Sequence, residues 1–109
     1  DIDEGMQDYV DVVNKLNKTS VDVLYLDYTE LPKEVFTKID LVIGCDICYW
    51  EGHVQNIVDL TKKAKGPVLI ADPGRDTFWQ LTEKVKGNLH EITLKKPRAV
   101  RGYIYEILP

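Results

Sequence analysis

The stretch that decides the fold is Asp40–Tyr49, DLVIGCDICY, in which an apolar run ends abruptly at Asp46 and Tyr49. A strand covered on both faces needs apolar side chains on both, and Leu41, Val42 and Ile43 fit that position. A carboxylate at the strand's end is not explained by packing. Ligands of open α/β sheets lie outside the carboxyl ends of the strands, so this acid and this phenol are placed to meet a ligand.

Two other expected strands also end in polar residues, at Asp27-Tyr28 and at Asp72-Pro73-Gly74-Arg75. The alternative for each is a plain turn or a helix cap, for which Asp, Pro and Gly are common choices. Because three such ends fall on one edge of the expected sheet, the sequence predicts a binding site at that edge. It also indicates that the protein is an enzyme.

Helical and extended patterns alternate along the chain with little between them. Helices are expected at residues 4–17, Gly52–Lys65 and Arg75–Lys86, with a short connection or helical turn at Leu31–Ile39. Strands are expected at Val21–Tyr28, Asp40–Tyr49, Pro67–Ala71, Leu89–Lys95 and Val100–Leu108. The last two are joined by a short link and should form an antiparallel hairpin. The order predicts a mostly parallel sheet with helices on both faces and the hairpin added to it.

Composition limits the kinds of partner. The chain has 109 residues, which is one small domain, and a net charge of −4. This charge argues against a nucleic-acid partner, which would need clustered Lys and Arg, and the basic run Lys95–Arg98 is short. No apolar segment approaches the roughly 20 residues of a membrane span. A cytoplasmic setting is expected from the low cysteine content.

The two cysteines, Cys45 and Cys48, form a single CxxC. They are expected to end a strand, whereas a redox pair needs a helix N-terminus to activate its thiol. His53 and His90 stand far apart without a second ligand at metal spacing, so no metal site is predicted.

The element order, the opening Asp-Ile-Asp and the strand ends at Asp27, Asp46 and Asp72 together resemble the seven-stranded S-adenosylmethionine-dependent methyltransferases. More narrowly, Asp46-Ile47-Cys48-Tyr49 is similar to the DxxY pattern of a branch rich in protein-lysine methyltransferases. The closing hairpin is a trait of the family too. The resemblance implies a Rossmann-like fold and covers nearly the whole chain.

The resemblance also implies site residues. Asp1, followed by Ile2, matches the acid that holds the cofactor ribose, with Asp3 as the competing candidate. Asp27, with Tyr28 beside it, matches the acid that meets the adenine amino group. The segment Gly44–Trp50 matches the part of the family that faces cofactor and substrate, with Cys45 on the cofactor side.

The expected catalytic residues are Asp46 and Tyr49. Asp46 would accept a hydrogen bond from an amine substrate and orient it, and Tyr49 would offer a ring face to the positive charge. Trp50, Asp72 and Arg75 would shape the substrate pocket. The reaction implied is methyl transfer from S-adenosylmethionine to a nitrogen of a protein lysine or a small amine.

One departure from the family concerns its first strand and glycine-rich loop, for which this chain shows no counterpart. We therefore expect a partial domain, truncated at its N-terminal side and covering residues 1–109. The alternative is a non-catalytic α/β scaffold that forms homo-oligomers through an exposed sheet edge.

Overall fold

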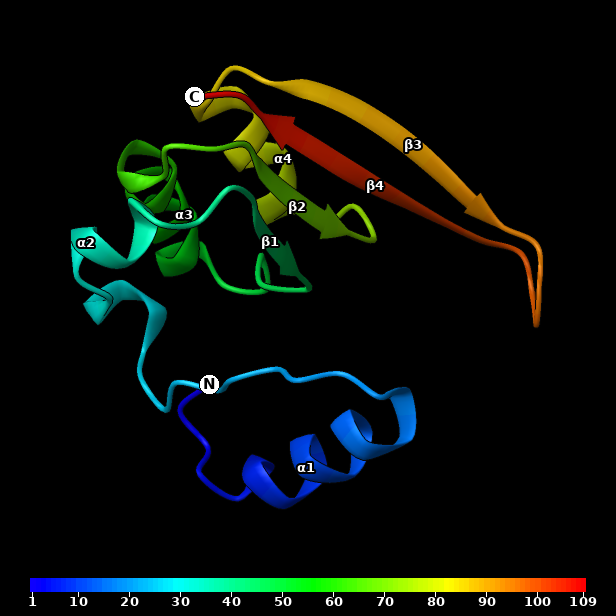
Figure 1. Cartoon of the computed structure of the whole chain (residues 1–109). Coiled ribbons are helices and arrows are strands. Elements are labelled where there is room, and N and C mark those ends of the chain that lie inside the picture. Colours follow the sequence, from blue (N-terminus) through cyan, green and yellow to red (C-terminus); the bar gives the residue numbers. More distant parts are fainter. The chain divides into compact units, whose positions relative to one another are not determined.

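The structure is a computed structural model that describes residues 1–109. The chain divides into two compact units, unit 1 (Asp1–Pro32) and unit 2 (Lys33–Pro109), which are described separately below (Figure 1). The expectation of one partial domain stays a prediction.

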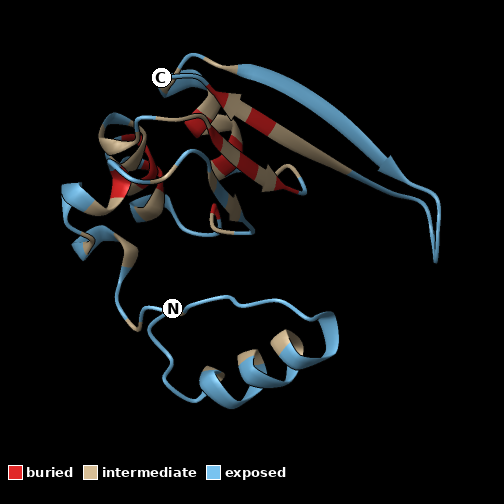
Figure 2. Ribbon diagram, in the orientation of Figure 1, coloured by how far each residue is buried: buried red, intermediate tan, exposed pale blue.

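Unit 1 is built around the helix α1 (Met6–Asn17), which confirms the helix expected at residues 4–17. Lys18 ends this helix in the left-handed region at φ 53°, and its N–H donates to the carbonyl of Asn14. A short 3-10 helix, η1 (Tyr28–Glu30), follows later in the unit. Unit 1 contains no buried residue, and Figure 2 accordingly shows no red in it.

The prediction of a strand at Val21–Tyr28 is wrong, because this segment pairs with no strand of the sheet. Its polar groups bond instead to side chains of α1. Asn14 accepts from the N–H of Val21 at 3.0 Å and donates to the Val21 carbonyl at 3.1 Å, and the Tyr25 hydroxyl donates to Gln7 at 2.7 Å. A run of β-branched and aromatic residues favours a strand only where another strand takes its backbone hydrogen bonds.

Unit 2 holds the rest of the regular structure. Its elements in order are α2 (Lys33–Phe36), β1 (Val42–Cys45), α3 (Glu51–Lys63), β2 (Val68–Asp72), α4 (Asp76–Lys84), β3 (Asn88–Leu94) and β4 (Val100–Ile107). The predicted helices and strands of this part are confirmed, with small shifts of their ends. The strand expected at Asp40–Tyr49 is shorter, because Asp46 turns into the left-handed region at φ 58°.

The 4-stranded sheet has the order β1-β2-β4-β3. The fold class is therefore α/β, but the prediction of a mostly parallel sheet is wrong. Only β1 and β2 are parallel; β4 runs antiparallel to both β2 and β3, and it is the second strand of the hairpin that pairs with β2. The β-α-β alternation fixes the direction of β1 and β2 alone, since a hairpin can dock by either of its strands.

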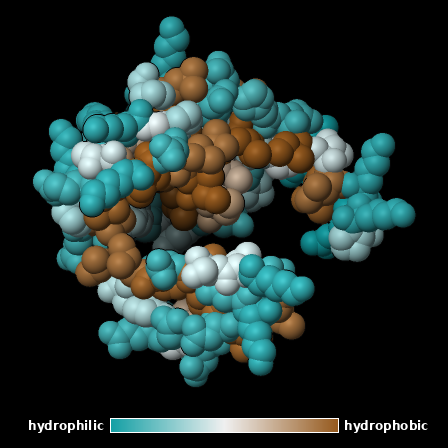
Figure 3. Space-filling view, viewed as in Figure 1, coloured by the Kyte–Doolittle hydropathy of each residue, from teal (hydrophilic) through white to brown (hydrophobic).

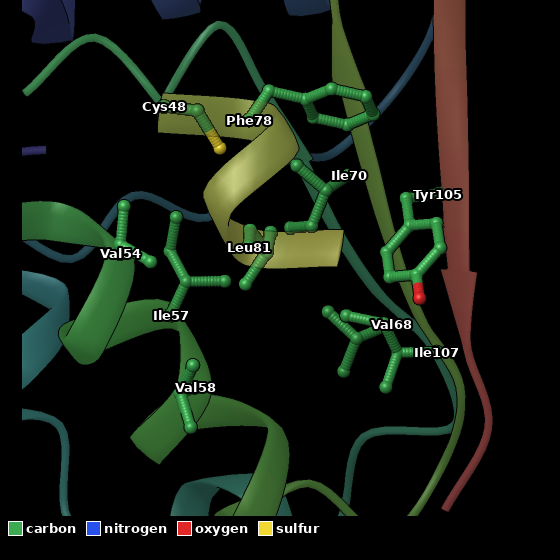
Figure 4. Packing of buried hydrophobic residues seen from close by; sticks show 10 residues of the cluster. All are labelled: Cys48, Val54, Ile57, Val58, Val68, Ile70, Phe78, Leu81, Tyr105 and Ile107. Carbon is green, nitrogen blue, oxygen red and sulfur yellow. The ribbon is translucent and has the colours of Figure 1, made fainter. Parts of the chain in front are cut away.

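The core lies between one face of this sheet and the two helices α3 and α4 (Figure 4). Its strand residues alternate along β2 and β4 and face the helices; they are Val68, Ile70, Tyr105 and Ile107. The helices contribute Ile57 from α3 and Phe78 and Leu81 from α4. Within unit 2 both long helices cover this same face, so the prediction of helices on both faces is wrong for this unit. The β1–β2 crossover contains α3 and the β2–β3 connection contains α4, and both connections pass over the same side of the sheet.

The opposite face of the sheet carries the other set of alternating residues. Ile43 is 68% exposed there, and Leu69 and Ile104 are partly buried. Apolar atoms gather over unit 2 in the space-filling view (Figure 3). No helix of the protein combines the length and the apolar character that a bilayer crossing requires.

Candidate functional site

The candidate site lies where the parallel strands β1 and β2 end. Cys45 pairs with Ala71, so Asp46 and Asp72 leave the two strands at neighbouring positions. The N–H of Asp46 still donates to the Ala71 carbonyl at 3.0 Å, and the backbone then turns at φ 58°. Asp tolerates this left-handed conformation better than most residues. The turn leaves the Asp46 side chain 70% exposed at the strand end.

Asp72 is the buried carboxylate of this site, and its side chain is 0% exposed. One oxygen accepts from the backbone N–H groups of Gly74 and Arg75, both at 2.9 Å. The other oxygen accepts from Nη1 of Arg75 at 2.7 Å. A buried charge is tolerated only when it is paired and hydrogen-bonded, and these contacts satisfy both conditions.

Arg75 joins the two acids. Its Nη1 contacts Asp72 at 2.7 Å and Asp46 at 2.9 Å. The hydrogen bonds that Arg75 donates to the carboxylates, first to Asp46 and then to Asp72, raise the pKa of Arg75 above its usual range. The guanidinium therefore stays charged, and the three side chains carry one net negative charge at the strand ends.

The turn between β2 and α4 requires a glycine. Gly74 has φ 103°, and a Cβ there would lie 2.8 Å from the ring of Tyr103. Trp79 donates its indole N–H to the Gly74 carbonyl at 3.1 Å, and its ring meets Tyr103 at 4.9 Å between centroids. These aromatic contacts hold the turn that presents Arg75.

A groove of about 310 Å³ opens beside these residues. Asp46 and Asp72 line one part of it, and the rest is lined mainly by apolar side chains of the strand ends and the hairpin. The apolar lining includes Cys45, Ala71, Ile92, Leu94, Val100 and Ile104. The sequence analysis did not assign the hairpin residues to the site. Their signal is the spacing of Ile92 and Leu94 on one hairpin strand and of Val100 and Ile104 on the other, which places each pair on one face.

The remaining predicted residues of unit 2 lie elsewhere. Tyr49 and Trp50 are 64% and 62% exposed and are not part of the groove lining. Their rings lie 4.8 and 5.4 Å from the ring of His53, at the start of α3. The structure thus brings Cys45, Asp46, Asp72 and Arg75 together, but not Tyr49 or Trp50.

The residues expected to bind the nucleoside belong to unit 1. Asp1 accepts from the N–H of Asp3 at 2.9 Å, and Ile2 is 76% exposed. Asp27 caps η1 by accepting from the N–H and the hydroxyl of Thr29, at 2.8 and 2.7 Å, and Tyr28 begins that helix. Both carboxylates therefore have local structural roles in unit 1.

The two thiols differ in their surroundings. Cys45 is exposed, whereas Cys48 is fully buried in the core of unit 2. Burial, helped by the nearby Asp72, raises the pKa of Cys48 to about 11. A thiol with such a pKa forms little thiolate at neutral pH, and the thiolate is the reactive species.

We therefore predict that a thiol reagent at pH 8 labels Cys45 in the folded protein and leaves Cys48 unlabelled. Adding denaturant should make Cys48 react as well, because unfolding returns its pKa to the ordinary range. Mass spectrometry of the labelled peptides checks this, with Cys45→Ser as the control that removes the fast site. Rapid labelling of Cys48 without denaturant would contradict its burial.

The chain has no significant match among protein-family models, curated proteins or solved structures. The observations that define it are an α/β fold and a strand-end groove with an acid–arginine–acid cluster.

Proposed function

We propose that the protein transfers a methyl group from S-adenosylmethionine to a nitrogen nucleophile, a protein lysine or a small amine. The observation that carries the proposal is the Asp46 carboxylate, held by Arg75 at 2.9 Å beside an apolar groove at the carboxyl ends of β1 and β2. This is the edge at which open α/β sheets bind their ligands. The closing β3–β4 hairpin agrees with the family resemblance and supports a Rossmann-like assignment.

Methyl transfer to an amine needs no covalent protein intermediate, but it needs the nucleophile held in line and shielded from water. Asp46 supplies an acceptor that orients an amine, and the apolar lining offers packing to the rest of the substrate. Because Asp46 is exposed and paired with Arg75, its role here is orientation and not proton abstraction. Tyr49 lies outside the groove lining, so the proposal does not depend on it.

The cofactor would be held by carboxylates, as the resemblance implies. A ribose diol and an adenine amino group are donors that carboxylates accept, which suits Asp1 and Asp27. When bound, S-adenosylmethionine supplies the electrophilic methyl group.

The open edge of β1 fits the same proposal. β1 is an outer strand of the sheet; Ile43 on it is 68% exposed, and Leu41, just before it, is 48% exposed. We propose that a further strand, equivalent to the family's first strand, pairs with this edge and brings the glycine-rich loop. Such pairing would satisfy the backbone groups that β1 leaves open.

The test is the substitution Asp46→Ala in the full-length protein. We expect turnover to fall about 100-fold, since loss of a positioning group costs roughly that much, while the affinity for S-adenosylhomocysteine stays unchanged. Asp59→Ala is the matched control, because Asp59 is an exposed acid on α3 that pairs only with neighbours on its own helix. Unchanged turnover in Asp46→Ala would refute the role given to Asp46.

The second candidate is a non-catalytic scaffold that forms dimers through the open edge of β1. The exposed Ile43 favours this candidate, because an apolar edge strand with unpaired backbone groups can pair with a strand of another chain. A concentration-dependent mass near twice 12.5 kDa, without nucleoside binding, would support this candidate over methyl transfer.

A further inference from the structure

The β3–β4 hairpin extends beyond the strand that it docks on (Figure 1). The last residue of β2 with a partner on β4 is Asp72, which pairs with Tyr103. The next pairs of the hairpin, from Ile92–Gly102 to Leu94–Val100, have no strand beside them on that edge. We call residues 92–101 the hairpin arm.

The end of this arm is strongly basic. Its positive side chains are Lys95, Lys96, Arg98 and Arg101, and no acidic residue lies between Lys95 and Arg101. Arg101 pairs with Glu91 at 3.0 Å, but Lys95, Lys96 and Arg98 have no carboxylate within ion-pair distance. The projecting end of the hairpin is accordingly hydrophilic in Figure 3. In a chain with a net charge of −4, this is a local surplus of positive charge.

One side of the arm is apolar and faces the groove. Ile92, Leu94 and Val100 are 38%, 57% and 41% exposed, and all three line the groove that also contains Asp46 and Asp72. The groove therefore has one net negative charge at the strand ends, an apolar middle, and positive charge where the arm ends.

We propose that the hairpin arm binds an acidic segment of a lysine-containing peptide, with the lysine directed to Asp46. This inference rests on the proposed function and names its substrate as a protein. Charge complementarity carries the assignment: the ammonium group meets Asp46, and carboxylates of the same peptide meet Lys95, Lys96 and Arg98. A small amine could occupy only the Asp46 end.

The length of the arm sets the spacing in the peptide. From Tyr103, which is level with Asp72, to Val100, where β4 begins, the chain advances three residues, or about 10 Å at about 3.4 Å per residue in a strand. Lys95, Lys96 and Arg98 lie in the turn beyond this point, so an extended peptide needs acids about four to six residues from the lysine.

A nucleic acid fits this surface less well. Its phosphates would meet the arm, but the same groove presents Asp46 and Asp72, which would repel them. The apolar lining by Ile92, Leu94 and Val100 also offers side-chain packing in place of further cations. The arrangement of both charge signs favours a peptide.

The experiment measures fluorescence anisotropy of a labelled peptide with a central lysine and three glutamates on each side, four to six residues away. Lys95→Glu/Lys96→Glu should weaken its binding at least about tenfold, and raising the salt from low to high ionic strength should weaken it as well. Lys65→Glu/Lys86→Glu makes the same charge change at exposed sites outside the arm and should leave binding unchanged. Because Lys95 and Lys96 are exposed, circular dichroism should show both variants folded.

The proposal is overturned if the arm variant binds the peptide as well as the control variant does, or if a peptide with glutamine for glutamate binds equally well. It is also overturned if an oligothymidine strand binds the arm more tightly than the peptide. Failure of the proposed function would look different. Peptide binding would then depend on the arm and on the lysine, but S-adenosylhomocysteine would not bind and the lysine would not be methylated.

Discussion

Replacing Phe78 by alanine is expected to lower the free energy of unfolding by about 3–5 kcal/mol, the usual cost of removing a buried aromatic ring. Phe78 is 0% exposed and lies where α4 meets the sheet. Its ring centroid lies 6.1 Å from Tyr103 and 6.4 Å from Tyr105, both on β4. The alanine variant would leave a cavity between the helix and the strand that carries the hairpin arm.

Such a loss is a large part of the 5–15 kcal/mol by which small proteins are stable. Urea unfolding followed by circular dichroism measures it. Trp50→Ala is the matched control, because Trp50 is an aromatic residue that is 62% exposed, and we expect that change to cost less than about 1 kcal/mol. Equal losses in the two variants would show that Phe78 is not the centre of the core.

Replacing Asp72 by alanine is expected to cost about 2–4 kcal/mol. The substitution removes the acceptor of two backbone N–H groups and the buried partner of Arg75. Breaking a fully buried ion pair from one side costs about 3–5 kcal/mol, and the lower range here reflects the partial exposure of Arg75. The turn Asp72–Arg75 would lose its anchor, and Arg75 would no longer be fixed beside Asp46.

Asp46→Ala is the control for this second substitution, since it removes the other partner of the same Arg75. Asp46 is 70% exposed, so its ion pair should contribute no more than about 1 kcal/mol. Chemical unfolding of both variants separates the two cases, and Asp72→Asn should fall between them because it keeps an acceptor. A larger loss in Asp46→Ala than in Asp72→Ala would contradict the assigned burial of the two acids.

The hydrophobic periodicity predicted α1, α3 and α4 and the closing hairpin, because each of these follows from a local pattern of side chains. The strand ends at Asp46 and Asp72 were also visible in the sequence, since an apolar run that stops at an acid is a local signal. The bond between Asp72 and Arg75 belongs to the same turn and is local too.

The features that sequence could not provide depend on distant partners. Val21–Tyr28 has the composition of a strand, but whether it becomes one depends on another strand beside it. The pairing of β2 with β4, and not with β3, brings Tyr105 of β4 beside Phe78, a contact between residues far apart in the sequence. The contact of Arg75 with Asp46 exists only because β1 and β2 are parallel neighbours.

The position of Tyr49 shows how one backbone angle changes a site. A strand that continued through Tyr49 would place Asp46 and Tyr49 on opposite faces of the sheet, because side chains alternate along a strand. The left-handed turn at Asp46 instead makes Cys48 the buried residue and places Tyr49 against His53. A positive φ at a residue other than glycine has no reliable signal in a single sequence.

The most direct test of methyl transfer is thermal unfolding of the full-length protein with and without S-adenosylhomocysteine. At about 100 times the dissociation constant, a ligand that binds only the folded state adds about 2.7 kcal/mol of stability. We expect a clear rise in the unfolding temperature, equal in the wild type and in Asp46→Ala, because Asp46 is assigned to the acceptor and not to the nucleoside. A cooperative transition that millimolar S-adenosylhomocysteine leaves unchanged would contradict the proposed function.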